Sequence, residues 1–355
     1  MEQRRRLRIL AKTRETTDAC TFVLEPADGR PLVYQAGQYL TLLFHSNAKE
    51  QRRAYSFSSC PGVDAFPAIT VKRVVNGAFS NHLLDHVQPG EVLDAIDPNG
   101  LFVLPEKHVD TYFFIAAGSG ITPVFSQLKM LLYSTKKECR DAKMVLYYAN
   151  RDSQSTIFKT QIDRWILEFP GRFECTYFFS REKNADHALF RHLNNELLEQ
   201  LVRAHFQGKI SLHARRNTWF YLCAPKALMR MARMTLRMLN FPEKHIRQET
   251  FMPESRLPVR AVDHSKTHTI LVSGRNERIE FQTYEGETIL DAALRQGIAL
   301  PYTCKSGVCF TCLAKCTAGH VDVAFVDATL HEGPGSMVNT CIGYAVSGRV
   351  ELLFA

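Results

Sequence analysis

Four cysteines near the end of the chain constrain this sequence more than any other feature. Cys304, Cys309 and Cys312 are spaced C-x4-C-x2-C, and Cys341 follows after 28 intervening residues. This is the plant-type spacing of a [2Fe–2S] cluster held by four thiolates. Three of the sulfurs must converge from one short loop, and the fourth must return from a distant part of the fold. The spacing therefore predicts a cluster whose metal ligands are these four cysteines.

A structural zinc site is the alternative for a set of four cysteines. Zinc usually takes paired C-x2-C knuckles, and the sequence has one such pair, Cys309 and Cys312. Cys316 extends the run to C-x2-C-x3-C, but Thr317 stands where the bacterial two-cluster motif has proline. We favour the cluster, and we interpret Cys316 as a buried strand residue.

Length and composition indicate a globular protein of several domains. The 355 residues are too many for one comfortable core, and the hydrophobic content of 45% and charged content of 23% are ordinary. No apolar run approaches the ~20 residues of a membrane-spanning helix, and the basic start is not followed by the apolar part of a signal peptide. We therefore expect a cytoplasmic protein without membrane insertion. The net charge is +8, but the sequence has no run of basic residues interleaved with aromatics, as nucleic-acid-binding surfaces have. No nucleic-acid partner is therefore expected.

Hydrophobic periodicity divides the chain into three domains. Residues 1–105 hold short apolar stretches separated by turn signals, which predicts a small β-barrel. Residues 106–252 alternate buried strands with helices, which predicts an α/β domain with a parallel sheet. Residues 253–266 carry prolines and charges without periodicity and are interpreted as a linker. Residues 267–355 form a third domain, which holds the four cysteines.

Two segments of the first domain have the residue types that hold a flavin nucleotide. Arg53-Ala54-Tyr55-Ser56 offers a cation for the pyrophosphate, an aromatic face for the ring and a hydroxyl for N5 and O4. An ordinary polar strand is an equally good interpretation of this segment. Gly77-Ala78-Phe79-Ser80 is a glycine turn that opens a helix, and helix N-termini favour phosphate. A plain capped helix is the alternative there.

Polar residues of the second domain stand where its predicted strands end. Gly118-Ser119-Gly120-Ile121-Thr122-Pro123 follows a buried strand and opens a helix, as a turn that receives a dinucleotide pyrophosphate does. Arg151 and Ser180-Arg181 end two further strands, and this set suits the extra 2′-phosphate of NADP. Solvated loop arginines are the other interpretation. Cys223-Ala224-Pro225 ends a fourth strand and points toward the same edge of the sheet. The alternative is a buried cysteine followed by a proline that starts a helix.

The order of these motifs resembles a known family. The chain is similar, over essentially its whole length, to the ferredoxin–NADP reductase superfamily with a C-terminal plant-type ferredoxin domain. Ile289–Gly297 running into Leu300–Cys304, and Gly118–Pro123 followed by Tyr148–Arg151, are very similar to the reductase subunits of phenylacetyl-CoA epoxidases. The resemblance implies an antiparallel β-barrel flavin domain, an α/β parallel-sheet nucleotide domain and an α+β ferredoxin domain of the β-grasp type.

The resemblance also implies roles for individual residues. Ser56 matches the catalytic position near flavin N5, Cys223 the position beside the nicotinamide, and Glu249 a position that closes the flavin site. The implied cofactor-binding residues are Arg53, Tyr55, Ser56, Lys72, Gly77, Phe79, Ser80, Gly118, Thr122, Arg151, Ser180, Arg181 and Phe251. The chain departs from the family at Ala224, where glycine is usual, and the extra methyl could crowd the nicotinamide.

The implied activity is electron transfer from NADPH, through FAD and a [2Fe–2S] cluster, to an oxygenase of the phenylacetyl-CoA epoxidase type. A flavin is required because hydride carries two electrons whereas the cluster accepts one. Two other enzymatic interpretations stay open, an FMN-containing dioxygenase reductase and a reductase for a hybrid-cluster protein. A non-enzymatic electron carrier or redox sensor is favoured by Ala224 alone.

Overall fold

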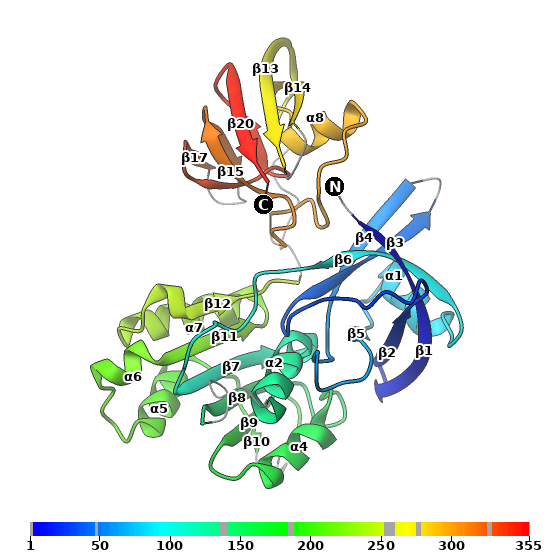
Figure 1. The fold of residues 1–355 in the computed structure, drawn as a ribbon. Coiled ribbons are helices and arrows are strands. Elements are labelled where there is room, and N and C mark those ends of the chain that lie inside the picture. Colours follow the sequence, from blue (N-terminus) through cyan, green and yellow to red (C-terminus); the bar gives the residue numbers. More distant parts are fainter. Residues whose placement is uncertain are drawn as a thin grey trace. The chain divides into compact units, whose positions relative to one another are not determined.

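The computed structural model describes residues 3–46, 49–134, 141–183, 188–251, 260–274, 278–307, 309–324 and 329–354. The chain divides into two units, each of which is described by itself. The first unit comprises Arg5–Gln51 and Tyr55–Thr250. The second comprises Phe251–Ala355 with the short segments Met1–Arg4 and Arg52–Ala54. Figure 1 labels the helices and strands of both units.

The first part of the first unit is a six-stranded antiparallel barrel. Its strands, in the sheet order β4-β3-β6-β1-β2-β5, are β1 (Arg4–Thr16), β2 (Ala19–Pro26), β3 (Tyr39–Ser46), β4 (Lys49–Ser56), β5 (Ala68–Lys72) and β6 (Val92–Asn99). An antiparallel bridge between Phe57 and Ile69 joins the end of β4 to β5, the two outer strands, and so closes the sheet. Alternate residues such as Leu7, Ile9 and Phe22 fill the interior. This confirms the predicted antiparallel flavin-type domain.

The rest of the first unit is a parallel sheet covered by helices. The strand order is β10-β9-β8-β7-β11-β12, with β7 (Thr111–Ala117), β8 (Lys143–Asn150), β9 (Phe173–Phe179), β10 (Ala188–Leu189), β11 (Thr218–Cys223) and β12 (Ile246–Gln248). Helix α1 (Ala78–Asp85) belongs to the barrel, where it packs against β5. The α-helices of the parallel-sheet part are α2 (Ile121–Tyr133), α4 (Lys159–Glu168), α5 (Asn195–His205), α6 (Leu212–Arg216) and α7 (Lys226–Met238). Two 3-10 turns are η1 (Gly118–Gly120) and η2 (Glu243–His245).

The period-two alternation of a strand explains how both faces of this sheet are covered. Tyr112 and Phe114 of β7 belong to the core that includes α2 and α4. Phe113 and Ile115, which alternate with them, belong to the core that includes α5 and α7. The predicted α/β domain is therefore confirmed, and the carboxyl ends of its strands form the edge at which such sheets bind ligands.

The second unit is an α+β domain in which a sheet packs against one helix. Its five-stranded sheet has the order β14-β13-β20-β15-β18, and a three-stranded sheet has the order β17-β16-β19. The elements are β13 (Asp263–Ser273), β14 (Arg278–Glu285), α8 (Ile289–Arg295), β15 (Leu313–Ala318), β16 (Val321–Ala324), β17 (Thr329–Glu332), β18 (Met337–Asn339), β19 (Gly343–Ala345) and β20 (Arg349–Leu353). Ile289 and Leu290 of α8 lie in the core of this unit, as does Cys316, which confirms its predicted place in a buried strand.

The predicted linker and the predicted domain bounds remain predictions. β13 begins at Asp263, inside the predicted linker 253–266, and residues 252–259 lie outside the described residues. In the described ranges no helix is long and apolar enough to cross a membrane.

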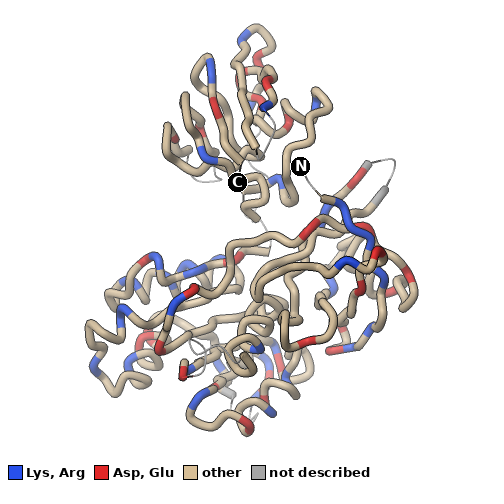
Figure 2. Tube along the Cα trace, in the orientation of Figure 1, with Lys and Arg blue, Asp and Glu red and all other residues tan. Residues whose placement is uncertain are grey.

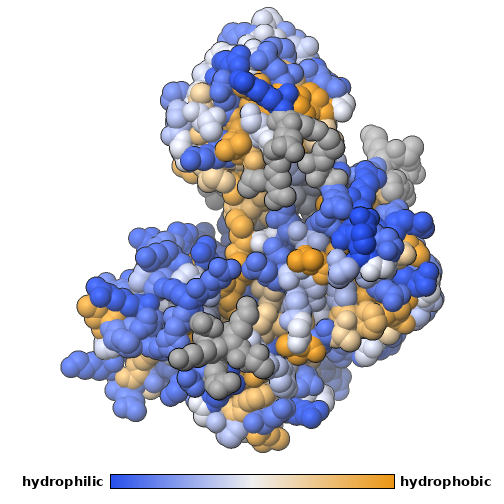
Figure 3. All heavy atoms as spheres, in the orientation of Figure 1, coloured by the Kyte–Doolittle hydropathy of each residue, from blue (hydrophilic) through white to orange (hydrophobic). Residues whose placement is uncertain are grey.

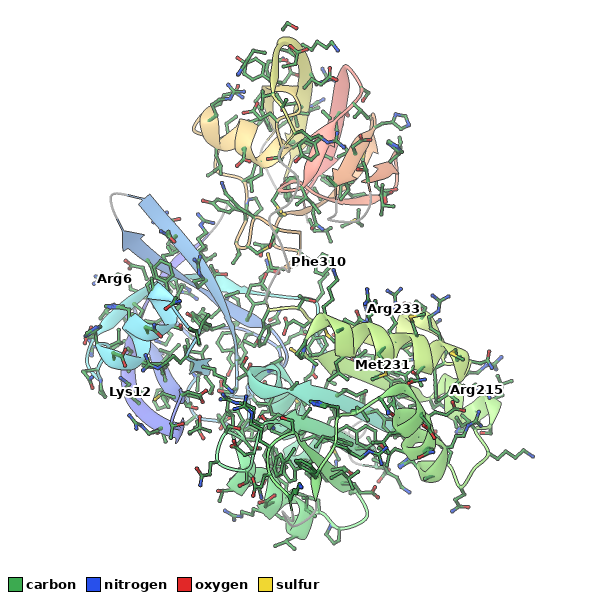
Figure 4. The ribbon with its side chains drawn as sticks, turned by 180° about the vertical axis from the view of Figure 1, so that it is seen from behind. Arg6, Lys12, Arg215, Met231, Arg233 and Phe310 are labelled. Atoms are coloured by element: carbon green, nitrogen blue, oxygen red, sulfur yellow. The ribbon has the colours of Figure 1, made fainter. Side chains whose placement is uncertain are left out.

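Positive charge is concentrated on one part of the parallel-sheet domain. Residues 203–247 contain ten Lys and Arg residues and one acidic residue, Glu243. These charges lie on and around α6 and α7 in Figure 2, and the same region is mostly hydrophilic on the face drawn in Figure 3. In Figure 4, Arg215 and Arg233 lie on the outer side of this region. A field of this sign attracts anionic molecules to the domain.

Candidate functional site

The four predicted metal ligands come from two segments that the second unit joins. Cys304, Cys309 and Cys312 lie in the loop between α8 and β15, whereas Cys341 follows β18. Thr340, next to Cys341, donates its backbone N–H and its hydroxyl to the carbonyl oxygen of Cys312, at 3.1 and 3.2 Å. The distant cysteine is thereby held beside the loop, as the sequence spacing requires.

The four thiols are linked by a chain of hydrogen bonds. Cys304 is hydrogen-bonded with Cys309, and Cys312 with Cys341, while a third contact joins Cys304 to Cys341. The hydrogen bonds from Cys309 and Cys341 lower the pKa of the Cys304 thiol, and the one from Cys341 lowers the pKa of the Cys312 thiol. The same contacts raise the pKa of the Cys309 and Cys341 thiols, which donate.

The cysteine spacing, rather than the contacts among the thiols, favours a two-iron cluster over a single zinc ion. C-x4-C-x2-C with a distant fourth cysteine is the spacing of a [2Fe–2S] cluster, in which each of two irons takes two thiolates. The four cysteines and the chemistry of their thiolates therefore suit the predicted [2Fe–2S] cluster.

The loop around the cysteines has the features that a cluster requires of its backbone. Gly307 adopts φ +74°, and a Cβ at this position would collide with the side chain of Ile342. The backbone N–H of Ser306 donates to Cys304 Sγ at 3.4 Å. The Ser306 side chain also acts on the Cys304 thiol and helps to lower its pKa. Val308 lies outside the described residues.

The predicted flavin residues lie along the end of β4 and the adjoining β5. Tyr55 is half-buried and packs at the margin of the barrel core, while Arg53 is exposed. Lys72 is the last residue of β5, directly opposite Ala19 of β2. Tyr55 and Lys72 thus place an aromatic ring and a cation on the barrel, which fits a flavin nucleotide. Arg53 falls in the second unit, and its predicted role at the flavin remains a prediction.

The glycine turn after β5 forms the start of α1, as predicted. Gly77 precedes the helix, no side chain caps its first turn, and a Cβ here would lie 2.8 Å from both Ser80 Oγ and Val74 Cβ. Ser80 Oγ accepts from the Val74 N–H and donates to the Gly77 carbonyl, which closes the turn. Phe79 packs against Phe44 of the barrel, with ring centroids 4.4 Å apart. The backbone N–H groups of α1 therefore remain suited to a phosphate.

The glycine loop after β7 faces the barrel. Gly118 has φ +52°, and a Cβ there would lie 3.7 Å from Lys72 Nζ. The buried Tyr148 hydroxyl donates to the Gly118 carbonyl at 3.1 Å, and Thr122 Oγ1 donates to the Ser119 carbonyl at 3.0 Å. The predicted pyrophosphate loop of one domain and the predicted flavin lysine of the other are therefore neighbours.

The three residues predicted to bind a 2′-phosphate are brought together. The N–H of Arg181 donates to the carbonyl of Arg151 at 2.8 Å, and the N–H of Ser180 donates to the carbonyl of Asn150 at 3.2 Å. The segments after β8 and β9 therefore run side by side beyond the sheet. Both arginine side chains are exposed, and two guanidinium groups with a hydroxyl suit a phosphate.

Ser56 and Glu249, two of the predicted catalytic residues, meet where the barrel adjoins the sheet. Ser56 Oγ donates to Glu249 Oε2 at 3.3 Å, although the residues are separated by 193 positions. Glu249 follows β12, and its N–H donates to the Leu222 carbonyl. Burial raises the pKa of the Glu249 carboxyl to about 8, and the hydrogen bond from Ser56 opposes part of this rise. The pair can hold or release a proton near neutral pH.

Cys223, the third predicted catalytic residue, is buried at the end of β11. Burial, and in second place the charge of Glu249, raises the pKa of its thiol well above the usual value, so it is a neutral thiol at neutral pH. A Cβ on Gly120 would collide with the backbone carbonyl of Cys223. The glycine loop and the end of β11 are therefore in direct contact. Phe251 falls in the second unit, and its predicted role at the flavin remains a prediction.

Replacing Gly120 by alanine is expected to destabilise the first unit by ~1–3 kcal/mol and to weaken nucleotide oxidation, because the new methyl overlaps the Cys223 carbonyl. Thermal unfolding and the rate of nucleotide-dependent ferricyanide reduction measure the two effects. Gly348→Ala is the matched control, since nothing lies within 4 Å of a Cβ at that position. Equal behaviour of the two variants would show that the close approach is not needed.

Three further residues of the site region were not found from the sequence. Asp18 lies against the predicted phosphate ligands Lys72 and Arg151, at 3.7 and 3.3 Å. Gln248 carries a buried Nε2 without a hydrogen-bond partner among the described residues, next to Glu249. Phe310, labelled in Figure 4, stands in the cysteine loop at φ 58° with 42% of its surface exposed. A bulky residue at positive φ is strained, and no sequence pattern signals it.

Comparison with known proteins agrees with the three-part architecture. Residues 6–104 match the oxidoreductase FAD-binding domain, residues 114–234 the oxidoreductase NAD-binding domain, and residues 272–346 the 2Fe-2S iron-sulfur cluster binding domain. These matches indicate FAD, a pyridine nucleotide and a [2Fe–2S] cluster as the cofactors. The residues described above fit each group.

Relatives match over most of the chain. One of the subunits of the 1,2-phenylacetyl-CoA epoxidase of Escherichia coli is 33% identical, over 86% of this chain and 85% of the relative. The ferredoxin reductase component of the 3-ketosteroid-9-alpha-monooxygenase of Mycolicibacterium smegmatis is 29% identical, over 98% and 96%. The solved structure of phthalate dioxygenase reductase shares the fold, with a TM-score of 0.60, 22% identity and coverage of 98% and 97%. The chain therefore belongs to the family of flavin- and [2Fe–2S]-containing, pyridine-nucleotide-dependent oxidoreductases in which this epoxidase component is found.

Proposed function

We propose that the chain oxidises NADPH and passes the electrons singly, through FAD and the [2Fe–2S] cluster, to an oxygenase. The observation that carries the proposal is the contact between Ser56 of the barrel and Glu249 of the parallel-sheet domain, 3.3 Å apart. It lies at the junction where a flavin held by the first domain and a nicotinamide held by the second have to meet. The four cysteines of the second unit would hold the [2Fe–2S] cluster, which supplies the one-electron acceptor.

The residues of the first unit orient the two nucleotides. FAD, when bound, accepts a hydride and returns its electrons one at a time, which is the chemistry that a one-electron cluster requires. Tyr55 offers an aromatic face for the flavin ring, and Lys72 with the start of α1 offers charge and N–H groups for its pyrophosphate. Gly118 keeps the opposing loop free of a side chain. Cys223, a neutral buried thiol, packs at the nicotinamide position without adding charge.

Ser56 and Glu249 are placed to receive a proton at the flavin site. A hydride that gives up both of its electrons leaves one proton behind, which these residues would carry away. Ser56 hydrogen-bonds the carboxyl group, whose pKa of about 8 lets it both accept and release a proton near neutral pH. Glu249 is therefore proposed as the group that carries the proton from Ser56 toward solvent.

NADPH, rather than NADH, is proposed as the donor because Arg151, Ser180 and Arg181 are adjacent at the ends of β8 and β9. Arg181→Gln is expected to raise the KM for NADPH about tenfold or more and to leave that for NADH unchanged, since a charge-assisted hydrogen bond is lost. Steady-state ferricyanide reduction with each nucleotide measures both constants. Arg164→Gln, which removes an exposed arginine of α4, is the control. Equal losses with NADH and NADPH would count against the 2′-phosphate role.

The oxygenase partner is proposed from the relatives, of which one is a component of an epoxidase and another the ferredoxin reductase component of a monooxygenase. The test combines the purified chain with NADPH, a CoA thioester substrate and the oxygenase component of the Escherichia coli epoxidase. Oxygenated product that requires the chain supports an epoxidase-type system. If NADPH bleaches the flavin but no product forms, the acceptor is a different one. If NADPH does not bleach the flavin, the proposed function fails. The cytoplasmic location expected from the sequence remains a prediction.

A further inference from the structure

Asp18 lies between two cations that the proposed function assigns to two different nucleotides. Its Oδ2 atom is 3.7 Å from Lys72 Nζ, the proposed ligand of the FAD pyrophosphate. The same oxygen is 3.3 Å from Arg151 Nη2, a proposed ligand of the NADPH 2′-phosphate. One carboxylate therefore contacts two cations that the proposed function assigns to phosphate groups.

The position of Asp18 is fixed by hydrogen bonds of the β1–β2 turn. Thr16 Oγ1 donates to Asp18 Oδ1 at 2.8 Å, which leaves Oδ2 directed to the two cations. The Arg73 N–H donates to the Asp18 carbonyl at 2.7 Å and ties the turn to the segment after Lys72. These hydrogen bonds fix the position of the Asp18 carboxylate.

The three charged side chains differ in how far solvent reaches them. Asp18 and Lys72 are 23% and 21% exposed, whereas Arg151 is 51% exposed. Arg151 therefore leaves the carboxylate more easily than Lys72 does, because its charge is better solvated when alone. Two cations against one carboxylate leave an excess positive charge, and a phosphate group with nearly two negative charges satisfies it better.

We infer that Asp18 is a specificity-determining counter-ion that Arg151 exchanges for the 2′-phosphate of the pyridine nucleotide. The inference rests on the proposed function. Before binding, Asp18 holds the Arg151 guanidinium in an ion pair. The incoming phosphate has to replace the carboxylate, so part of its attraction to Arg151 is offset. The resulting weaker binding favours release of the oxidised nucleotide after each hydride transfer.

The test measures binding of nucleotide fragments that cannot transfer hydride. Calorimetry of the FAD-loaded full chain with 2′,5′-ADP and with 5′-AMP separates the contribution of the 2′-phosphate. Asp18→Asn is expected to bind 2′,5′-ADP about three- to fivefold more tightly than the wild-type chain, with 5′-AMP unchanged, because a competing partly exposed ion pair is removed. The gain should shrink as ionic strength rises.

Two further variants show that the effect passes through Arg151. In Arg151→Gln, the added change Asp18→Asn should no longer tighten binding of 2′,5′-ADP, as expected for a coupled pair. Asp64→Asn is the matched control, since Asp64 pairs with Lys129 at 2.8 Å and is 29% exposed. The control should leave the affinity for both fragments unchanged.

The outcomes separate this inference from the proposed function. One outcome is that the wild-type chain binds 2′,5′-ADP while Asp18→Asn binds it equally well or more weakly. That result overturns the role of Asp18 but leaves NADPH as the proposed donor. Equal tightening of 5′-AMP and 2′,5′-ADP overturns the assignment to the 2′-phosphate. A wild-type chain that does not distinguish the two fragments overturns both the inference and the NADPH proposal.

Discussion

The Cys341→Ser chain should contain no [2Fe–2S] cluster but should still oxidise NADPH when ferricyanide is the acceptor. Cys341 is hydrogen-bonded to both Cys304 and Cys312, so its loss leaves one iron with a single thiolate. A cluster of this type needs two thiolates per iron. Electron delivery beyond the flavin is therefore expected to fall below detection, whereas chemistry at the flavin remains.

The cluster can be lost while the flavin chemistry remains because the two units have separate hydrophobic cores. The core around the cysteines consists of residues between Ile270 and Leu352, including those of α8. The barrel and the parallel sheet have cores of their own, which contain none of these residues. Loss of the cluster is therefore expected to destabilise the second unit without unfolding the first. Iron and sulfide per chain, and flavin content, are the measurements.

Cys316→Ser is the matched control for this loss. Cys316 is fully buried in β15, four residues beyond the ligand Cys312, and its thiol donates to the carbonyl groups of Ala318 and Gly319. Serine can make the same hydrogen bonds, so the variant should keep two irons per chain. A Cys341→Ser chain that retained both irons would contradict the assignment of the ligands, and zinc in place of iron in the wild-type chain would contradict the cluster.

The layered architecture was predictable because it depends on local pattern. Tyr112–Ala117 is apolar at every position, as a strand covered on both faces must be, and it forms the centre of the parallel sheet. The cysteine spacing was equally informative, since the ligand loop is a local geometry. The turns at Gly118 and Gly77 were predictable for the same reason, because both select glycine. Gly118 has a left-handed backbone at φ +52°, and a Cβ at Gly77 would lie 2.8 Å from its neighbours.

Contacts between distant segments were not predictable from pattern. Asp18 follows an ordinary strand and looks like any turn aspartate until the sheet register places Ala19 opposite Lys72. Ser56 and Glu249 were assigned by resemblance, and nothing in either local sequence indicates that their side chains meet. Such pairs depend on how the barrel packs against the parallel sheet, which periodicity does not describe.

Replacing Glu249 by glutamine is expected to slow electron delivery to the cluster on the order of 10²-fold, the usual contribution of a positioned acid–base group. Glutamine keeps the size of the side chain and can still accept the hydrogen bond from Ser56, which is 3.3 Å in the parent chain. It cannot take up a proton. Binding of NADPH and of FAD should therefore be almost unchanged, and the loss should appear in kcat rather than in KM.

The pH profile distinguishes this role from a structural one. The pKa of Glu249 is raised from 4.5 to about 8, so its carboxylate forms as the pH rises through that value. The rate of proton removal, and with it electron delivery, should rise toward pH 8 in the parent chain and lose this dependence in Glu249→Gln. The same shift means that stability falls as the pH rises from about 4.5 to 8, because the unfolded chain releases the Glu249 proton that the folded chain keeps. The variant, which has no such proton, should not show this loss of stability. Glu243→Gln, at an exposed acid six positions earlier, should leave the profile intact. A Glu249→Gln chain that kept the rise near pH 8 would assign the proton to another group.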